Sequence, residues 1–546
     1  MRTLNRAMIR QPACLVVAAL LLTLACAPAQ PKPTITNGPA GGGNSPSSGA
    51  PAASSSQAGG SQASSQSGGT RRVTEVLGSE VLSISPYGDS ASPTYGMWMH
   101  VFEPLIYFSE ATSQNEPLLA TSWSNPDPNT WVFTLRQDVK FHDGSDFTAD
   151  DVVHSYKRMR DDPTSQQRST FSNVDGIDAP DKYTVRLHTK EPDAALIFRL
   201  NNRMITSKTA FDKYGSGEEA DKHPNGTGPW LFKEFVPGQR VVLEKNPNYW
   251  DTDRKATFDE LVVRFIKEPQ ASVTALMNGE VDVIPNVPPQ LVDQVQNSGR
   301  AHISAAPGTR LMFLGMNSAY KPWDNVKLRQ AVNYAIDKEG IVKGILSGRA
   351  RVLNTPIGPG MYAYEPSLQP QYTYDPAKAK QLLAEAGYPN GLDVELQSPS
   401  GRYLKDKEIA EAIVNMLGQV GIRASLVTPE WGKIWPDIQA GRSPFYLLGR
   451  GAVEDPGEYL EQYFKTGITP RVNFSDNQVD ADLQAAAREF DPPKRVELLH
   501  KAMSRIMDQA PMVFLLQYED TYGVSNRLDF KARGDEYVYA WDMKLK

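Results

Sequence analysis

The sequence predicts a mixed α/β fold, and three observations indicate it. The chain has 546 residues, of which 40% are hydrophobic and 22% charged, which is enough for two to four domains with packed cores. Several segments alternate apolar and polar residues, as strands with one buried face do. Between them lie segments whose apolar residues recur at helical spacing. Strands and helices are therefore expected to intermix along the chain.

The stretch at 131–159 shows how these elements are identified. Residues 131–136 read WVFTLR, an alternation that predicts a strand, and the Asp-Gly pair at 143–144 predicts a turn. Thr148 is expected to cap the helix that follows, with Asp151 in the capping-box position. The buried stripe of this helix is predicted at the spacing i, i+4, i+7: Val152, Tyr156 and Met159.

Later segments are predicted in the same way. Asp324 precedes a helix with one apolar face, and residues 494–509 form another amphipathic segment. In YDPAKAKQLLAEAGY (374–388), Asp375 is expected to cap a helix that ends at Gly387. Two further strands are expected: 309–317 and 511–518.

The N-terminal region is predicted to be a targeting signal followed by a flexible tether. Residues 1–25 hold three arginines and then an apolar run too short to span about 30 Å of hydrocarbon, the layout of a secretory signal peptide. The end of the run resembles a bacterial lipobox, which makes Cys26 the expected site of lipid attachment. The alternative is a plain cleaved signal with an incidental cysteine. Residues 26–71 are rich in Ser, Gly and Pro and are expected to form a disordered tether.

Charge and motif spacing argue against several classes of protein. The formal net charge is −6, and no basic block is present to bind a phosphate backbone, so no nucleic-acid partner is expected. The seven histidines are scattered, and no pair has the zinc-binding spacing with a glutamate between. Neither a Gly-x-Ser-x-Gly elbow nor a phosphate-binding glycine loop occurs. We therefore expect no catalytic residue, no metal site and no cofactor.

Seven segments, in order along the chain, carry a family likeness. The chain resembles the extracellular solute-binding proteins of ABC importers, in the peptide, nickel and opine branch called family 5. No single segment is decisive, but seven in the right order are specific, and together they span nearly all of 72–546. The segments are 117–159, 226–232, 244–251, 277–284, 321–339, 374–388 and 508–518.

The resemblance implies a fold of the type II periplasmic-binding-protein kind, with two α/β lobes that close on a solute about a hinge, plus an added third domain. Carried onto this chain, lobe I comprises 72–105, 207–309 and 519–546. The added domain comprises 106–206, and lobe III comprises 310–518. The histidines and aspartates of 131–159 then belong to a strand, a turn and a capped helix of the added domain, away from any ligand.

Two places in the sequence match ligand-contacting positions of the family. In peptide-binding relatives an early strand pairs with the backbone of the extended ligand, and the matching segment is Gly78–Ser83. Its candidate contacts are Glu80, Val81, Leu82 and Ser83; the alternative is an ordinary first strand. Trp431 matches a tryptophan that lines the family's cleft, whereas Trp435, one turn further along, is expected in the core.

The third candidate is the loop at 448–460. Arg450 stands where many relatives have a tryptophan, and the aspartate that pairs with a peptide amine in those relatives has no clean match. The candidates are Glu454 and Asp455, although Asp455 followed by proline favours a structural turn. Arg450 is expected either to bind a carboxylate or phosphate of the solute or to lie at the rim of the cleft.

These observations predict a solute-binding component of an ABC importer. The expected solute is an oligopeptide or dipeptide, with a sugar, an opine or sugar phosphate, or a metal chelate as alternatives. The expected partners are permease subunits with cytoplasmic ATPases, and the membrane through the N-terminal lipid. The protein is expected to be a monomer held outside the cytoplasmic membrane, in the periplasm or on the outer face of the cell membrane. A surface sensor or adaptor and a hydrolase are the alternative classes.

Overall fold

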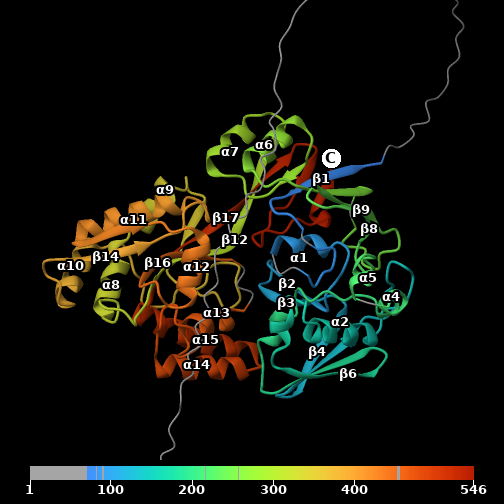
Figure 1. Ribbon diagram of the computed structural model, residues 1–546, viewed down its shortest axis with the longest axis horizontal. Helices are drawn as coiled ribbons and strands as arrows, with labels where there is room; N and C mark the ends of the chain where they lie inside the picture. The colour runs from blue at the N-terminus through green and yellow to red at the C-terminus, as the bar shows by residue number, and fades with distance from the viewer. Residues whose placement is uncertain (1–69, 82, 89–91, 216, 256, 452–454) are drawn as a thin grey trace, which may run out of the picture. The chain divides into compact units, whose positions relative to one another are not determined.

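The computed structural model describes residues 70–546 except 82, 89–91, 216, 256 and 452–454, and it is mixed α/β (Figure 1). The predicted signal peptide, Cys26 and nearly all of the predicted tether lie outside the described residues. Arg71, the last residue assigned to the tether, is held in place, because its backbone N–H donates to Asp259 Oδ2 at 3.1 Å. No helix in the described ranges is long and apolar enough to cross a membrane.

One large sheet runs through both lobes. Its strand order is β15-β14-β16-β12-β17-β11-β1-β10-β9-β8, with β13 also paired to β17. The lobe I elements are β1 (Arg72–Leu77), α1 (Ser92–Trp98), α4 (Lys208–Tyr214), α5 (Gly217–Asp221), β8 (Trp230–Val236), β9 (Arg240–Lys245), β10 (Glu260–Phe265), α6 (Pro269–Asn278), β11 (Val283–Ile284), α7 (Pro289–Gln296), β18 (Leu528–Phe530), η2 (Ala540–Asp542) and β19 (Met543–Leu545).

The elements of lobe III form the other part of the sheet and its covering helices. They are α8 (Val326–Ala335), α9 (Lys338–Gly344), β13 (Ala350–Val352), α10 (Pro376–Glu385), β14 (Leu392–Gln397), α11 (Asp406–Val420), β15 (Ile422–Val427), α12 (Trp431–Gln439), β16 (Phe445–Arg450), α13 (Pro456–Phe464), α14 (Asn477–Arg488) and α15 (Pro492–Gln509). The predicted caps are confirmed at α10, where Asp375 accepts a hydrogen bond from Lys378 N at 2.9 Å and Gly387 has φ +97°.

Two long antiparallel strands, β12 (Ala301–Met316) and β17 (Met512–Ser525), join the halves of the sheet (Figure 1). Both are longer than the predicted strands at 309–317 and 511–518. The burial pattern explains the error, because nearly every residue of β17 is buried on both faces and no alternation marks its end. Strands of this length continue from one lobe into the other and form the connection between them.

The ladder between β12 and β17 is interrupted where the two lobes meet. Pro307 is opposite Glu519 and Leu311 is opposite Gln517, so three residues of β12 face one of β17. Proline has no N–H to donate to a ladder, and the extra residues form a bulge. The boundaries inferred from the family resemblance, 309/310 and 518/519, fall at this interruption.

The added domain has a sheet of its own, in the order β4-β5-β7-β6, with α2 packed on it. The capping box of Thr148 and Asp151 is present, and the three predicted stripe residues of α2 are all 0% exposed, which confirms both predictions. The elements are β2 (Ile106–Ser109), β3 (Gln114–Pro117), β4 (Ala120–Asp127), β5 (Thr130–Leu135), α2 (Ala149–Asp161), η1 (Arg168–Phe171), β6 (Val174–Asp181), β7 (Thr184–Thr189) and α3 (Leu196–Arg199).

Buried apolar side chains gather in separate clusters. The largest draws every buried member from residues 311–518, and a second draws nearly all of its members from 105–205. Two others combine residues 73–118, 204–301 and 522–543. Each cluster is a core of its own, and this supports the proposed division into two lobes and an added domain.

Candidate functional site

A cavity of about 400 Å³ lies beside the interruption in β12 and β17, and both lobes line it. Lobe I contributes Asn286, Asp520 and Glu536, and lobe III contributes Arg310, Arg402 and Tyr403. A smaller cavity of about 220 Å³ lies at the carboxyl end of β1 and shares Asn286 and Glu536 with the first. A solute that entered these cavities would contact both lobes.

Acidic side chains occupy the lobe I wall. Glu536 forms an ion pair with Arg310 at 2.7 Å, across the proposed division between the lobes. Asp520 is buried, its Oδ2 has no hydrogen-bond partner among the described residues, and burial together with the Glu536 carboxylate holds its pKa well above the usual range. Burial alone raises the pKa of Glu75 to about 8. Two carboxyl groups at these cavities therefore favour the protonated form.

Arginines on aromatic rings occupy the lobe III side. The Arg402 guanidinium lies 5.0 Å from the ring centre of Trp431 and 5.5 Å from that of Tyr403. Trp431 is half-buried at the start of α12 and stacks on Trp435, with ring centres 5.6 Å apart and planes at 9°. The core position expected for Trp435 is wrong, because this ring is also half-buried. The helical spacing correctly places the two rings on one face but does not show how deeply that face is covered.

Arg450 and Arg471 continue this row of rings. Arg450 ends β16, bonds through Nη1 to Gln462 Oε1, and lies 5.9 Å from the ring centre of Tyr463. Arg471 is 5.0 Å from the same ring and 5.1 Å from that of Trp435. The Nε atom of each arginine is buried without a hydrogen-bond partner among the described residues.

The segment Gly78–Ser83 does not form the strand that the sequence predicts. The strand β1 ends at Leu77, and the described residues of this segment are not strand. Glu80 pairs with Lys267 at 3.4 Å, Val81 is 1% exposed in the core of lobe I, and Ser83 accepts from Ser85 N at 3.0 Å. Leu82 lies outside the described residues.

The strand prediction fails because the ladder to β10 ends with the pair Leu77 and Phe265, although Val81 continues the apolar pattern. Gly78 and Ser79 do line the smaller cavity. A contact between Glu80, Val81 or Ser83 and a solute stays a prediction.

Asp455 is held inside lobe III. Its carboxylate accepts two hydrogen bonds from Arg495 Nη2, at 2.7 and 2.9 Å, and it also caps α13 through Gly457 N. Both side chains of the pair are almost fully buried. Asp455 therefore has a structural role, as the N-cap of a helix that begins at Pro456 rather than as part of a turn, while Glu454 lies outside the described residues. The Asp455 carboxylate is already paired and is poorly placed to accept a solute amine.

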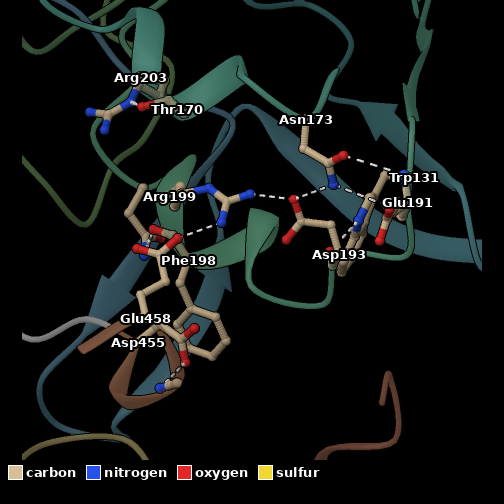
Figure 2. A network of polar contacts seen from close by, with 12 residues as sticks. Trp131, Thr170, Asn173, Glu191, Asp193, Phe198, Arg199, Arg203, Asp455 and Glu458 are labelled. Atoms are coloured by element: carbon tan, nitrogen blue, oxygen red, sulfur yellow. Dashed lines mark hydrogen bonds and ion pairs between the residues drawn. The ribbon is translucent and has the colours of Figure 1, made fainter. Parts of the chain in front are cut away.

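The same helix, α13, joins lobe III to the added domain. Figure 2 shows Arg199 of the added domain between Asp193 and Glu458, with dashed lines to both. Asn173 Nδ2 donates to Asp193 Oδ2 at 3.1 Å and extends the network (Figure 2). Asp455 and Glu458 therefore serve contacts within the protein.

The histidines of 131–159 have structural roles. His142 Nε2 lies 2.9 Å from Gly228 O, and burial lowers its pKa to about 4. His154 packs on Phe211, with ring centres 4.5 Å apart. Asp143 accepts from Ser145 N at 3.0 Å and forms the predicted turn. No group of three His, Cys, Asp or Glu side chains in the described part of the chain is placed to hold a metal ion.

Sequence reasoning missed Arg402, Arg471, Asp520 and Glu75. None belongs to a recognisable motif. Arg471, Asp520 and Glu75 become notable through burial and a side-chain atom without a hydrogen-bond partner among the described residues, and Arg402 through its place over two rings at the cavity. The absence of an acidic residue near Arg471 in the sequence, from 469 to 474, was the one local sign of an unpaired cation.

Comparisons with known proteins point to one family. The model of the bacterial extracellular solute-binding proteins, family 5 Middle, matches residues 114–470. The heme-binding protein A of Haemophilus influenzae is 29% identical over 446 residues, covering 76% of this chain and 81% of that protein. The dipeptide-binding protein of Escherichia coli is 29% identical over 447 residues, covering 76% and 83%.

A solved structure extends the likeness. The ABC transporter-associated periplasmic binding protein DppA from Helicobacter pylori, in complex with the peptide STSA, superposes with a TM-score of 0.69 at 26% identity. The match covers 87% of this chain and 98% of that one. The named relatives are binding proteins, and the solved one shares the fold of this chain.

Proposed function

The chain belongs to the family 5 bacterial extracellular solute-binding proteins, and from this premise we propose that it captures an oligopeptide or dipeptide and delivers it to an ABC permease. The observation that carries the proposal is the cavity of about 400 Å³ that both lobes line beside the interruption in β12 and β17. Closure of the lobes about these strands would enclose a solute there. A peptide solute is supported by the dipeptide-binding relative and by the peptide complex of the structural relative.

Trp431 and Arg450 are the proposed contacts on lobe III. Trp431 offers a half-buried aromatic surface, and Arg450 has a guanidinium without an acidic partner among the described residues. Glu80, Val81 and Ser83 remain proposed contacts on lobe I, next to Gly78 and Ser79 at the smaller cavity. We propose that the protein releases its solute unchanged and carries out no catalysis.

Native mass spectrometry of the purified full chain should detect a bound small molecule, and denaturation should release it for identification. Released peptides would support the proposal, whereas a sugar, an opine, a sugar phosphate or a metal chelate would contradict the peptide assignment. With an equimolar tripeptide mixture as the probe, Trp431→Ala should lower the affinity about tenfold, since one aromatic wall is removed. Tyr374→Ala, at an exposed ring on the same lobe, is the control.

A separate genetic test addresses the transport role. Deletion of the permease genes should abolish uptake of the released solute. Unchanged uptake would instead favour a surface sensor or adaptor, for which the binding event is the same.

We propose further that Cys26 carries lipid and holds a monomeric protein on the membrane, in line with the extracytoplasmic location of the family. Cys26→Ser should move the protein from the membrane fraction to the soluble fraction, because the acyl chains that anchor it would be lost. Fractionation followed by immunoblotting measures this shift. A wild-type protein already found in the soluble fraction would contradict lipid attachment.

A further inference from the structure

Two buried carboxyl groups at the cavities between the lobes have no partner within the described part of the chain. Asp520 of β17 is 5% exposed and lines the cavity of about 400 Å³, and Glu75 of β1 is 2% exposed and lines the cavity of about 220 Å³. Asp520 Oδ2 and Glu75 Oε2 make no hydrogen bond to the described residues, and no described Lys or Arg forms an ion pair with either side chain. A buried polar group without a partner costs free energy, so its presence in a cavity wall points to a ligand.

Every other buried acidic residue in the described ranges has a hydrogen-bond or ion-pair partner, which makes these two distinctive. The half-buried Asp542 also has a buried oxygen without a hydrogen bond, but it forms an ion pair with Arg533 at 3.5 Å. A purely structural role for Asp520 would predict a partner of this kind. The buried acidic residues with partners are Glu103, Asp151, Asp193, Glu260, Asp282, Asp406, Asp455 and Asp482.

The loop that carries Glu536 brings a second carboxylate to this wall. Glu536 and Asn286 line both cavities, and both have a left-handed backbone, with φ of +65° and +54°. This conformation is uncommon outside glycine, and asparagine adopts it more readily than glutamate. Backbone strain of this kind gathers at ligand-binding sites. The Glu536 carboxylate is also the charge that acts most strongly on Asp520, so the two acidic groups lie close together.

The fold gives Asp520 space in the wall but no countercharge of its own. A Cβ atom at position 308 would lie 2.7 Å from Asp520 Oδ1, so Gly308 leaves room for the carboxyl group beside the interruption in β12. Among the described cations, Arg310 acts on Asp520, but it already forms an ion pair with Glu536 at 2.7 Å. One arginine therefore faces two carboxyl groups, and the wall has room for a second positive charge.

We propose that Asp520 and Glu536 form a cation subsite on the lobe I wall, which binds an ammonium group of the solute. The inference rests on the proposed capture of a solute between the lobes. An ammonium group is present on a lysine side chain and on the amino terminus of a peptide, and each offers three N–H donors to the two carboxylates. Glu75 continues the acidic wall at the smaller cavity.

Binding at this subsite should release a proton. Burial and the carboxylates of Glu536, Asp535 and Glu110 hold the pKa of Asp520 well above its usual range, and Arg310 acts in the opposite direction. The empty subsite therefore favours the protonated carboxyl, whereas a bound ammonium group favours the ionised one. The affinity for a cationic solute should rise with pH until Asp520 is ionised in the empty protein.

Titration calorimetry in phosphate and in HEPES, which differ in ionisation enthalpy, measures the released proton. The apparent binding enthalpy of the wild type should differ between the two buffers, and the difference should disappear in Asp520→Asn. Equal enthalpies for the wild type would contradict an Asp520 that ionises on binding.

The test of the subsite compares four tripeptides on the purified full chain: Ala-Lys-Ala, Ala-norleucine-Ala and the N-acetylated form of each. We expect at least tenfold tighter binding of lysine over norleucine, or of the free over the acetylated terminus, and the pair that shows the preference identifies the source of the ammonium group. Asp520→Asn and Glu536→Gln should each reduce this preference to less than threefold, because one carboxylate is lost. Asp529→Asn, which removes an exposed charge from β18 of the same lobe, should leave it unchanged.

The outcomes separate the subsite from the proposed function. Equal binding of all four peptides overturns the subsite and leaves solute capture in place, and so does a preference that persists in both variants. Binding of no peptide, with a rise in Tm on addition of cadaverine that Asp520→Asn abolishes, supports the subsite and rejects a peptide solute. No effect of peptide or cadaverine rejects both. Glu536 is half-buried on a loop, so Glu536→Gln decides the question should Asp520→Asn fail to fold.

Discussion

Replacement of Arg495 by alanine should lower the free energy of unfolding by about 3–5 kcal/mol. The side chain of Arg495 is 4% exposed and that of Asp455 is 2% exposed, so the substitution leaves a carboxylate buried without its cation. Arg495 Nε also donates to Ala486 O at 3.1 Å, and the guanidinium lies 5.3 Å from the ring centre of Phe198 in the added domain. The loss therefore includes a contact between two parts of the chain.

Chemical denaturation followed by far-UV circular dichroism measures this effect. Arg423→Ala is the matched control, because it removes an arginine from a pair that is largely exposed, with Asp393, and should cost less than about 1 kcal/mol. Replacement of both members of the buried pair by leucine should recover part of the loss, since no lone charge remains. Equal destabilisation by Arg495→Ala and Arg423→Ala would contradict the assignment of the buried pair as a structural element.

Replacement of Glu75 by glutamine should change how stability depends on pH. Burial raises the pKa of Glu75 from 4.5 to about 8 in the folded protein, so the unfolded chain loses this proton first. The stability that the protonated side chain provides is complete below about pH 4.5 and is lost as the pH rises toward 8. Between pH 5 and pH 8, the wild type should lose about 3 kcal/mol more unfolding free energy than Glu75→Gln does.

Thermal and chemical unfolding of the solute-free protein at several pH values provides the measurement. The control, Glu80→Gln, makes the same substitution five residues further along, at a side chain that pairs with Lys267 near the surface. Its stability should follow that of the wild type with pH. Parallel curves for the wild type and Glu75→Gln would show that the Glu75 carboxyl ionises in the folded protein at the same pH as in the unfolded chain.

Local features of the fold could be predicted from the sequence because their causes lie within a few residues. The stripe of α2 follows from helical spacing, and the caps at Thr148 and Asp375 follow from side chains that bond to the next turn. The family resemblance could also be recognised from the sequence, since it depends on the order of short segments along the chain. The full lengths of β12 and β17 could not. β17 is buried on both faces along nearly all of its length and shows no alternation at its end, whereas the first half of β12 is only partly buried and lacks the apolar run of its second half.

The candidate site could be predicted from the sequence only in part. Trp431 and Arg450 were identified from the family positions, and the structure brings them into one row of rings with Arg471, which no motif indicates. The sequence makes Asp455 a candidate contact for a solute amine, but the structure shows that it pairs with Arg495, 40 residues away in the chain.

The sequence by itself determined the mixed α/β class, the local caps and the family, since these depend on short-range patterns. The tertiary structure decided which charges are paired and which remain unpaired at the cavity. The pairing of charges depends on contacts between segments that are far apart in the chain, and local sequence patterns give no information about such contacts.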